Sequence, residues 1–157
     1  MDLKPTWEYV ADNVMGGVSN GGIRRERHHG CESSILYGDV SLFNNGGFIQ
    51  IACDLRSSPV LLEARKWIGL EMDVSGNGER YDIRLRTHQL TRPWQSFRTE
   101  FTALPEWQTL RIPFDTFTSH KTDAIFDQAQ LRRIGILAIG REFKALVAVA
   151  GMRLYKL

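Results

Sequence analysis

The sequence of 157 residues is long enough for one domain with a hydrophobic core of its own. Its 20 basic and 18 acidic side chains give a net charge of +2, which by itself indicates neither a nucleic-acid nor a membrane partner. No apolar run approaches the roughly 18 residues that span a membrane, and the start lacks the basic and apolar segments of a secretory signal. We therefore expect a single cytoplasmic domain over residues 1–157.

Alternation of apolar and polar residues predicts β-strands along most of the chain. Strands are expected over roughly ten segments: residues 6–11, 22–29, 32–42, 46–55, 67–75, 81–88, 94–101, 107–112, 134–140 and 143–157. Asn44, Asn45 and Gly46 are expected to close a hairpin, and residues 75–80 another. Helix is scarce, with short turns expected after Pro59 and after a cap at Asp123.

Even spacing of short strands favours an all-β fold, an antiparallel two-sheet β-sandwich or barrel with little helix. The strand over 67–75 is expected to neighbour those over 81–88 and 94–101. Its outward carboxylates, Glu71 and Asp73, would then form an ion-pair ladder with arginines, although they could also imitate a glycosidase pair. The predicted core comprises Ile68, Leu70, Ile83, Leu85, Phe97, Phe101, Leu110, Ile112, Ile136 and Val147.

The glycine-rich stretch from Gly16 to Gly22 has to be tested for phosphate binding. It lacks the Lys-Ser/Thr pair of a phosphate-binding loop and the G-x-G-x-x-G spacing of dinucleotide-binding folds. No apolar stripe follows that would form the required helix. The stretch therefore does not predict a nucleotide site.

No set of residues indicates catalysis or metal binding. His28 and His29 would point to opposite faces of a strand, so they could not chelate one metal together. Calcium bound by oxygen ligands is an alternative, but no spaced carboxylates resemble a calcium loop. Cys31 and Cys53 are expected to be buried or half-buried thiols, with a disulfide left open. Without a nucleophile beside a base, we expect no enzyme, no metal and no cofactor.

Outward arginines and a tryptophan make the most informative predicted surface. Guanidinium groups beside an indole suit a sugar ring, a carboxylate or a protein loop, whereas the alternative is that the tryptophan caps the edge of the sandwich. The residues expected to gather there are Arg84, Arg86, His88, Trp94 and Arg98. Asn13 and Ser19, from the glycine-rich loop, are expected at the rim of this surface.

Several uncommon strings occur in order: Trp7, then DNVMGGVS at 12–19, YGDVSL at 37–42 and NNGGF at 44–48, followed by GLEMDVSGNGERYDIRLRT and WQTLRIPFDTF. In this order the sequence resembles the complex I intermediate-associated protein 30 family, along nearly the whole chain. The resemblance implies a jelly-roll sandwich like galactose-binding domains and some carbohydrate-binding modules. It also implies a chaperone or scaffold role in assembly of respiratory complex I, with no established catalytic residues. The length of a bare domain suggests a bacterial stand-alone member.

In that context, the segment after Asp12 is expected to form a corner where the chain switches between sheets. Gly16 or Gly17 would have positive φ, and Met15 would fill the core beneath. Asp12 and Asn13 would hydrogen-bond the loop backbone, unless the loop contacts a ligand instead. The remaining residues assigned to this structural motif are Trp7, Gly46, Gly47 and Phe48.

Two functions follow from the sequence. The first is a non-enzymatic binding or assembly module that holds a protein partner, such as respiratory-complex assembly intermediates, as the resemblance implies. The alternative is a carbohydrate or small-ligand binding module of the jelly-roll type, by analogy of fold. Neither involves nucleic acid or a membrane span.

Overall fold

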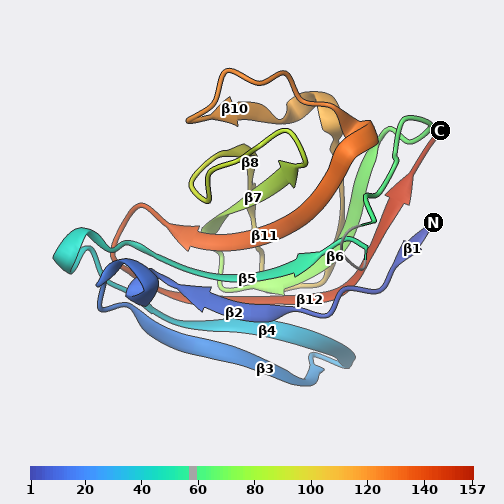
Figure 1. Ribbon diagram of the computed structural model, residues 1–157. Helices are drawn as coiled ribbons and strands as arrows, with labels where there is room; N and C mark the ends of the chain where they lie inside the picture. Colours follow the sequence, from blue (N-terminus) through green and yellow to red (C-terminus); the bar gives the residue numbers. More distant parts are fainter. Residues whose placement is uncertain (57–59) are drawn as a thin grey trace.

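The alternating segments form two antiparallel sheets that pack face to face in the computed structural model, which describes residues 1–56 and 60–157 (Figure 1). The first sheet has the order β3 (Asn20–His28), β4 (Cys31–Val40), β12 (Phe143–Tyr155), β6 (Gly69–Gly76) and β9 (Gln108–Pro113), with β1 (Asp2–Leu3) paired to β12. The second has the order β10 (Thr118–His120), β8 (Ser96–Thr102), β7 (Arg80–Thr87), β11 (Leu131–Ile139), β5 (Phe48–Asp54) and β2 (Glu8–Ala11). The all-β sandwich is confirmed.

Helical structure in the described residues is limited to four short 3-10 turns: η1 (Asp12–Met15), η2 (Phe43–Asn45), η3 (Phe114–Thr116) and η4 (Gln128–Gln130). The side chain of Asp127, not Asp123, caps η4 by accepting from the backbone of Ala129. The turn expected after Pro59 begins outside the described residues, and no helix follows over residues 60–66.

The two predicted hairpins are in fact crossings between the sheets. β4 lies in the first sheet and β5 in the second, and the same holds for β6 and β7. The hairpins expected at Asn44–Gly46 and at 75–80 are therefore wrong. Turn residues specify that the chain reverses direction, but burial of apolar faces decides which strands pair.

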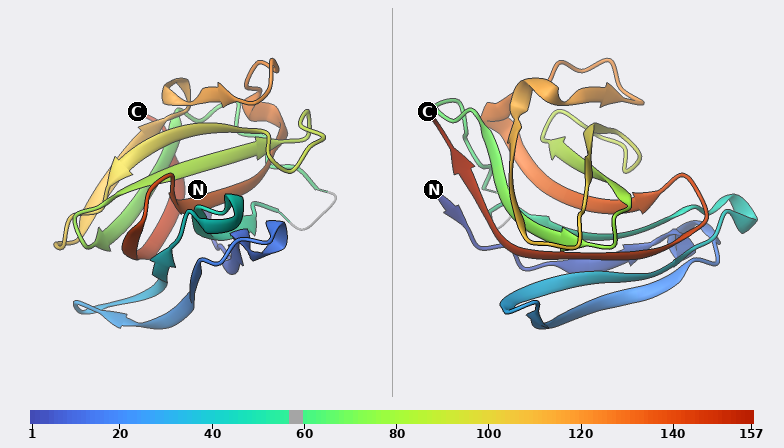
Figure 2. Two further views of the ribbon diagram at one scale, coloured as in Figure 1. Left: turned by 90° about the vertical axis from the view of Figure 1, so that its left-hand side faces the viewer. Right: turned by 180° about the vertical axis from the view of Figure 1, so that it is seen from behind.

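The hairpin between β3 and β4 and the segment around β10 lie at opposite ends of the molecule (Figure 2).

The crossing after β6 also corrects the predicted neighbours of that strand. β6 pairs with β9 and β12, not with β7 or β8. Glu71 accordingly bonds to Arg111 and Arg153, and Asp73 to Arg153. The two carboxylates thus form the predicted ion-pair ladder, but their partners lie on β9 and β12, which the sequence analysis did not predict as neighbours of this strand.

The core between the sheets contains most of the predicted residues. Leu110 is half-buried against this core, and Ile68 is 36% exposed, so its assignment was wrong. Ile68 precedes β6, which begins at Gly69, and the inward alternation begins only with the strand. The predicted residues that are buried are Leu70, Ile83, Leu85, Phe97, Phe101, Ile112, Ile136 and Val147.

The corner after β2 is confirmed as a switch between sheets. It joins β2 in the second sheet to β3 in the first, and Gly16 has φ +85 while Gly17 does not have positive φ. The backbone N–H groups of Gly16 and Gly17 donate to the carbonyl oxygens of Asn13 and Asp12 at 3.1 and 2.9 Å. The Met15 side chain, expected as a core plug, lies outside the described residues.

Asp12 joins this corner to the crossing between β4 and β5. Its buried carboxylate accepts from the Ser19 N–H at 3.1 Å and hydroxyl at 2.5 Å, and from the N–H groups of Gly47 and Phe48 at 2.7 and 3.3 Å. A Cβ at Gly17 or Gly46 would lie 2.5 Å from that carboxyl group. The glycines at these two positions are therefore needed so that both crossings can close around one side chain.

Burial alone would raise the pKa of Asp12. The hydrogen bonds from Ser19, Gly47 and Phe48 outweigh this effect and hold the pKa below its usual value. Asp12 is therefore ionised at neutral pH. The prediction that Asp12 hydrogen-bonds the loop backbone is confirmed. Asp12 also accepts from Gly47 in the second crossing, 35 residues away in the sequence.

Replacing Gly16 with valine is expected to lower the free energy of unfolding by about 1–3 kcal/mol, because a β-branched residue strains at positive φ. Asparagine tolerates the left-handed region, so Gly16→Asn should cost less. Chemical denaturation of both variants measures the difference. Equal losses would contradict the role assigned to the backbone conformation.

Candidate functional site

A cleft of about 1130 Å³ lies on the outer face of the second sheet, away from the core. Side chains from all six strands of that sheet line it, together with the loop between β7 and β8 that carries Trp94. Period-two alternation places residues 82, 84 and 86 of β7 on this face, because the buried Ile83 and Leu85 point to the other. The predicted surface residues Arg84, Arg86, Trp94 and Arg98 all line this cleft.

Asp82 holds Arg84 and Arg98 together. These two arginines are direct cross-strand partners on β7 and β8. Arg84 donates to the nearly buried Asp82 at 2.9 and 3.1 Å, and Arg98 does so at 2.9 and 3.0 Å. Arg98 also donates to Glu100 at 2.8 Å, and these bonds raise its pKa above the usual value. The carboxylates of Asp82 and Glu100 are thus committed to arginines, and neither is free for acid–base chemistry.

Arg86 holds the loop that presents Trp94. Its Nε donates to the Gln95 carbonyl at 3.1 Å and its Nη2 to the Arg92 carbonyl at 2.8 Å. The Gln95 side chain in turn accepts from the N–H groups of Thr91 and Arg92 at 3.2 and 3.0 Å. Burial and the neighbouring charges of Arg132 and Arg133 lower the pKa of Arg86. Arg86 therefore positions the loop instead of offering a free guanidinium.

Trp94 is 58% exposed, so it does not serve as a buried cap on the sandwich edge. The loop that carries this exposed indole is held by four hydrogen bonds, so a ligand that bound there would pay little entropy to order it. The sequence predicted the presence of Trp94 at the site but placed it within a strand. β8 begins only at Ser96.

Replacing Arg86 with glutamine is expected to loosen the loop over 88–95 while leaving the core intact. Glutamine lacks the forked donors that reach two carbonyls at once. We expect amide exchange in the loop to rise on the order of tenfold, with a stability change below about 1.5 kcal/mol. Hydrogen exchange measures both, and unchanged protection of residues 92–95 would contradict the positioning role.

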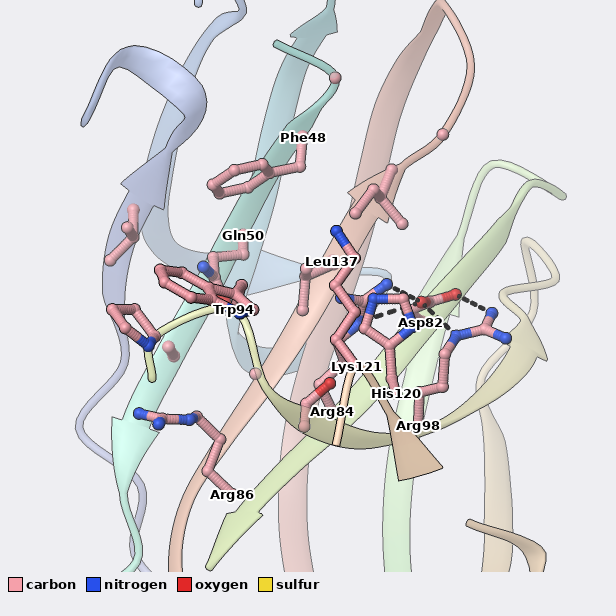
Figure 3. Close-up of a pocket in the computed structure, with 18 of the residues that line it drawn as sticks. Phe48, Gln50, Asp82, Arg84, Arg86, Trp94, Arg98, His120, Lys121 and Leu137 are labelled. Carbon is pink, nitrogen blue, oxygen red and sulfur yellow. Dashed lines mark hydrogen bonds and ion pairs between the residues drawn. The ribbon is translucent and has the colours of Figure 1, made fainter. Parts of the chain in front are cut away.

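The sequence analysis did not predict the part of the cleft that β5 and β10 form. Phe48 and Gln50 of β5 lie near Trp94, whereas Lys121, His120 and the Asp82 group lie beyond Leu137 (Figure 3). Gly135 and Ala52 lie in the floor, where a Cβ on Gly135 would come within 2.7 Å of the Gln50 amide oxygen. Alternation along residues 46–55 could have placed Gln50 on this face, but nothing local indicated β5 and β10 as walls of one cleft.

Three residues expected at this surface lie elsewhere. Ser19 is buried, and its hydroxyl donates to Asp12, so its assignment to the rim was wrong. Asn13 is exposed but donates to the Gly17 carbonyl at 3.0 Å, and it does not line the cleft. His88 follows the end of β7 and is exposed outside the cleft. In contrast, Gly46, Gly47 and Phe48, expected to be structural, line it.

The histidine pair lies at the β3–β4 turn, far along the first sheet. β3 ends at His28, and His29 turns with φ +44, so the two rings stack with centroids 4.1 Å apart. The expected placement on opposite faces was therefore wrong. Within residues 1–56 and 60–157, no cluster of three or more histidine, cysteine or acidic residues could hold a metal ion.

Both cysteines are free thiols. Cys31 is half-buried and Cys53 is buried, as expected. Burial raises the pKa of the Cys53 thiol to about 12, which leaves it protonated and unreactive at neutral pH. No helix in the described part of the chain is long and apolar enough to cross a membrane.

Comparison with known proteins agrees with the fold. The family model described as Complex I intermediate-associated protein 30 (CIA30) matches residues 2–146. No curated protein matches the chain. Among solved structures, the family 11 carbohydrate-binding module of the cellulosomal cellulase Lic26A-Cel5E of Clostridium thermocellum aligns with a TM-score of 0.77 at 12% identity, over 100% of this chain and 93% of that one.

Two further solved structures are similar. A family 11 module from the same organism, in complex with a β-1,3-1,4-mixed-linked tetrasaccharide, aligns with a TM-score of 0.75 at 14% identity, over 99% and 92% of the two chains. The family 30 module of its cellulase Cel9D-Cel44B aligns at 0.72 and 15%, over 99% and 95%. At these identities the likeness demonstrates a shared jelly-roll fold.

Proposed function

Because the chain belongs to the complex I intermediate-associated protein 30 family, we propose that it is a non-catalytic module that binds a segment of a partner protein in the cleft of its second sheet. The family description refers to complex I intermediates, and the proposed partner is a subunit of such a respiratory assembly intermediate. Holding that subunit would be the module's contribution to assembly.

The observation that carries this proposal is the exposed Trp94 on a loop anchored by Arg86. Tryptophan and arginine are the residues that most often dominate binding energy at protein interfaces. In this cleft Trp94 is exposed, and Arg86 holds the loop that carries it. Because Asp82 and Glu100 are occupied by arginines, the cleft is better suited to binding than to acid–base catalysis.

Photo-crosslinking tests the proposal. A benzophenone amino acid replaces Trp94 in one variant and Lys144, on the exposed face of β12 in the first sheet, in the control. In extracts of the source organism, irradiation is expected to join the first variant, but not the control, to one or a few proteins identified by mass spectrometry. Identical adducts from both positions, or none from position 94, would contradict the proposal.

Carbohydrate binding is the second candidate, supported by the similar module solved with a mixed-linked tetrasaccharide. A ligand that binds only the folded state raises the melting temperature. Mixed-linked oligosaccharides should therefore stabilise the protein in this case, and Trp94→Ala should abolish the stabilisation. No shift at saturating oligosaccharide would exclude this candidate.

A further inference from the structure

The cleft is lined by more basic than acidic side chains. Its lining includes two acidic side chains, Asp82 and Glu100, and seven basic ones: Arg80, Arg84, Arg86, Arg98, Lys121, Arg133 and Arg141. We infer that the ligand of this cleft is an acidic polypeptide segment, bound through its carboxylates. The inference rests on the proposed function for the presence of a protein ligand and adds the chemistry of that ligand.

The arginines of the cleft outnumber the carboxylates with which they form ion pairs inside it. Asp82 is shared by Arg84 and Arg98, and Glu100 is shared by Arg98 at 2.8 Å and Arg80 at 3.5 Å. Three guanidinium groups therefore converge on two carboxylates. Arg133 and Arg141 are paired with acidic side chains from outside the lining, Glu8, Asp54 and Glu79.

Two basic groups of the cleft have no carboxylate partner among the described residues. Within the part of the chain that the structure describes, neither Lys121 nor Arg86 has an acidic oxygen within 4.0 Å. Arg86 is occupied by loop carbonyls, but Lys121 is exposed and extends into the cleft (Figure 3). Its three ammonium donors are available to a ligand.

Arg84 and Arg98 retain donors as well. Each uses Nε and Nη2 for Asp82 or Glu100, and in the described residues the Nη1 group of neither arginine makes a hydrogen bond. A ligand carboxylate could therefore accept from Lys121 and from these guanidinium groups without displacing Asp82. The apolar side of the cleft, formed by Trp94, Phe48 and Leu137, could take an apolar side chain of the same segment.

The titration of His120 agrees with a positive potential in the cleft. Burial together with the charges of Arg84, Lys121 and Arg98 lowers its pKa, so it is neutral at pH 7. Covering such a site with a neutral ligand would remove water from the cations without supplying an opposite charge, which is unfavourable. The carboxylates of an acidic segment supply that charge, and the charge complementarity also speeds association.

Fluorescence anisotropy with two peptides tests the inference. One is a fluorescein-labelled peptide of Glu, Gly and Leu, and its twin has Gln at each Glu position. We expect the full protein to bind the Glu peptide and not the twin, with affinity falling on the order of tenfold between low and high salt as the charges are screened. Equal binding of the two peptides, or of neither, would overturn the inference.

A matched set of variants localises the binding. Lys121→Gln is expected to weaken binding of the Glu peptide about threefold to fivefold, whereas Lys121→Arg retains it. Lys144→Gln removes the same charge from the first sheet and should have no effect. A loss of affinity with Lys144→Gln equal to that with Lys121→Gln would mean nonspecific attraction and would overturn the inference.

Failure of the inference can be distinguished from failure of the proposed function. If the segment crosslinked from position 94 is neutral or basic, the inference is wrong while the proposed function stands. If no protein crosslinks there and the oligosaccharide binds, both are wrong. If a uronic-acid polymer binds in a manner sensitive to Lys121→Gln and the Glu peptide does not, the ligand is an acidic polysaccharide and the inference is wrong.

Discussion

Replacing Asp12 with alanine is expected to lower the free energy of unfolding by about 4 kcal/mol, roughly 8–16 °C in melting temperature for a domain of this size. The buried carboxylate accepts four hydrogen bonds that hold two crossings between the sheets together. Alanine removes the acceptor of the Ser19, Gly47 and Phe48 N–H groups, leaves the Ser19 hydroxyl only the Ser41 carbonyl, and leaves a space between Gly17 and Gly46. Urea denaturation followed by tryptophan fluorescence measures the loss.

Asp39→Ala provides the control, because its carboxylate is 57% exposed and pairs with Lys144 at 3.7 Å. Its loss should be below about 0.5 kcal/mol. Asp12→Ala behaving like this control would show that the two crossings close without the carboxylate.

The contribution of Asp12 also depends on pH in a defined direction. Its pKa is lower in the folded state than in the unfolded chain, so its stabilisation is fully present above the unfolded value of about 3.9. The stabilisation is lost as pH falls through the lower, folded value. The stability gap between the native protein and Asp12→Asn should therefore narrow in acid, and a gap that widens below pH 4 would be inconsistent with an ionised Asp12.

Replacing Trp94 with alanine is expected to weaken partner binding at least tenfold and up to about a hundredfold, the range typical of a central interface tryptophan. The melting temperature should stay nearly unchanged, because the side chain is 58% exposed and contributes little to the core. Calorimetric titration with the segment identified by crosslinking measures the affinity, and a thermal melt measures the stability.

Tyr155→Ala is the matched control, since it truncates an aromatic residue of β12 in the first sheet. It should bind the partner segment as the native protein does. Trp94→Ala with full affinity would place the partner outside the cleft. Trp94→Ala with a large loss of stability would instead assign the indole to packing.

Local patterns in the sequence were enough to predict the fold class and the outward face on which the candidate site lies. Period-two alternation separated Ile83 and Leu85 from Arg84 and Arg86, because successive side chains of any strand point to opposite faces. The same local rule predicted the core positions apart from Ile68. Positive φ at Gly16 or Gly17 was also predicted, since it depends on backbone sterics at one corner, and the structure shows it at Gly16. These are properties of short stretches of chain.

The contacts that residues on different strands make with one another could not be predicted from local patterns, because they depend on how the two sheets pack. Asn44–Gly46 and residues 75–80 reverse the chain, but the packing of two apolar faces made both into crossings between sheets. That packing brought Asp12 to Gly47, and Gln50 and Lys121 to one cleft. It also paired Glu71 with Arg153 instead of with an arginine of the strands over 81–88 or 94–101. Contacts between distant strands follow from burying apolar area across the whole domain, which no local pattern of residues encodes.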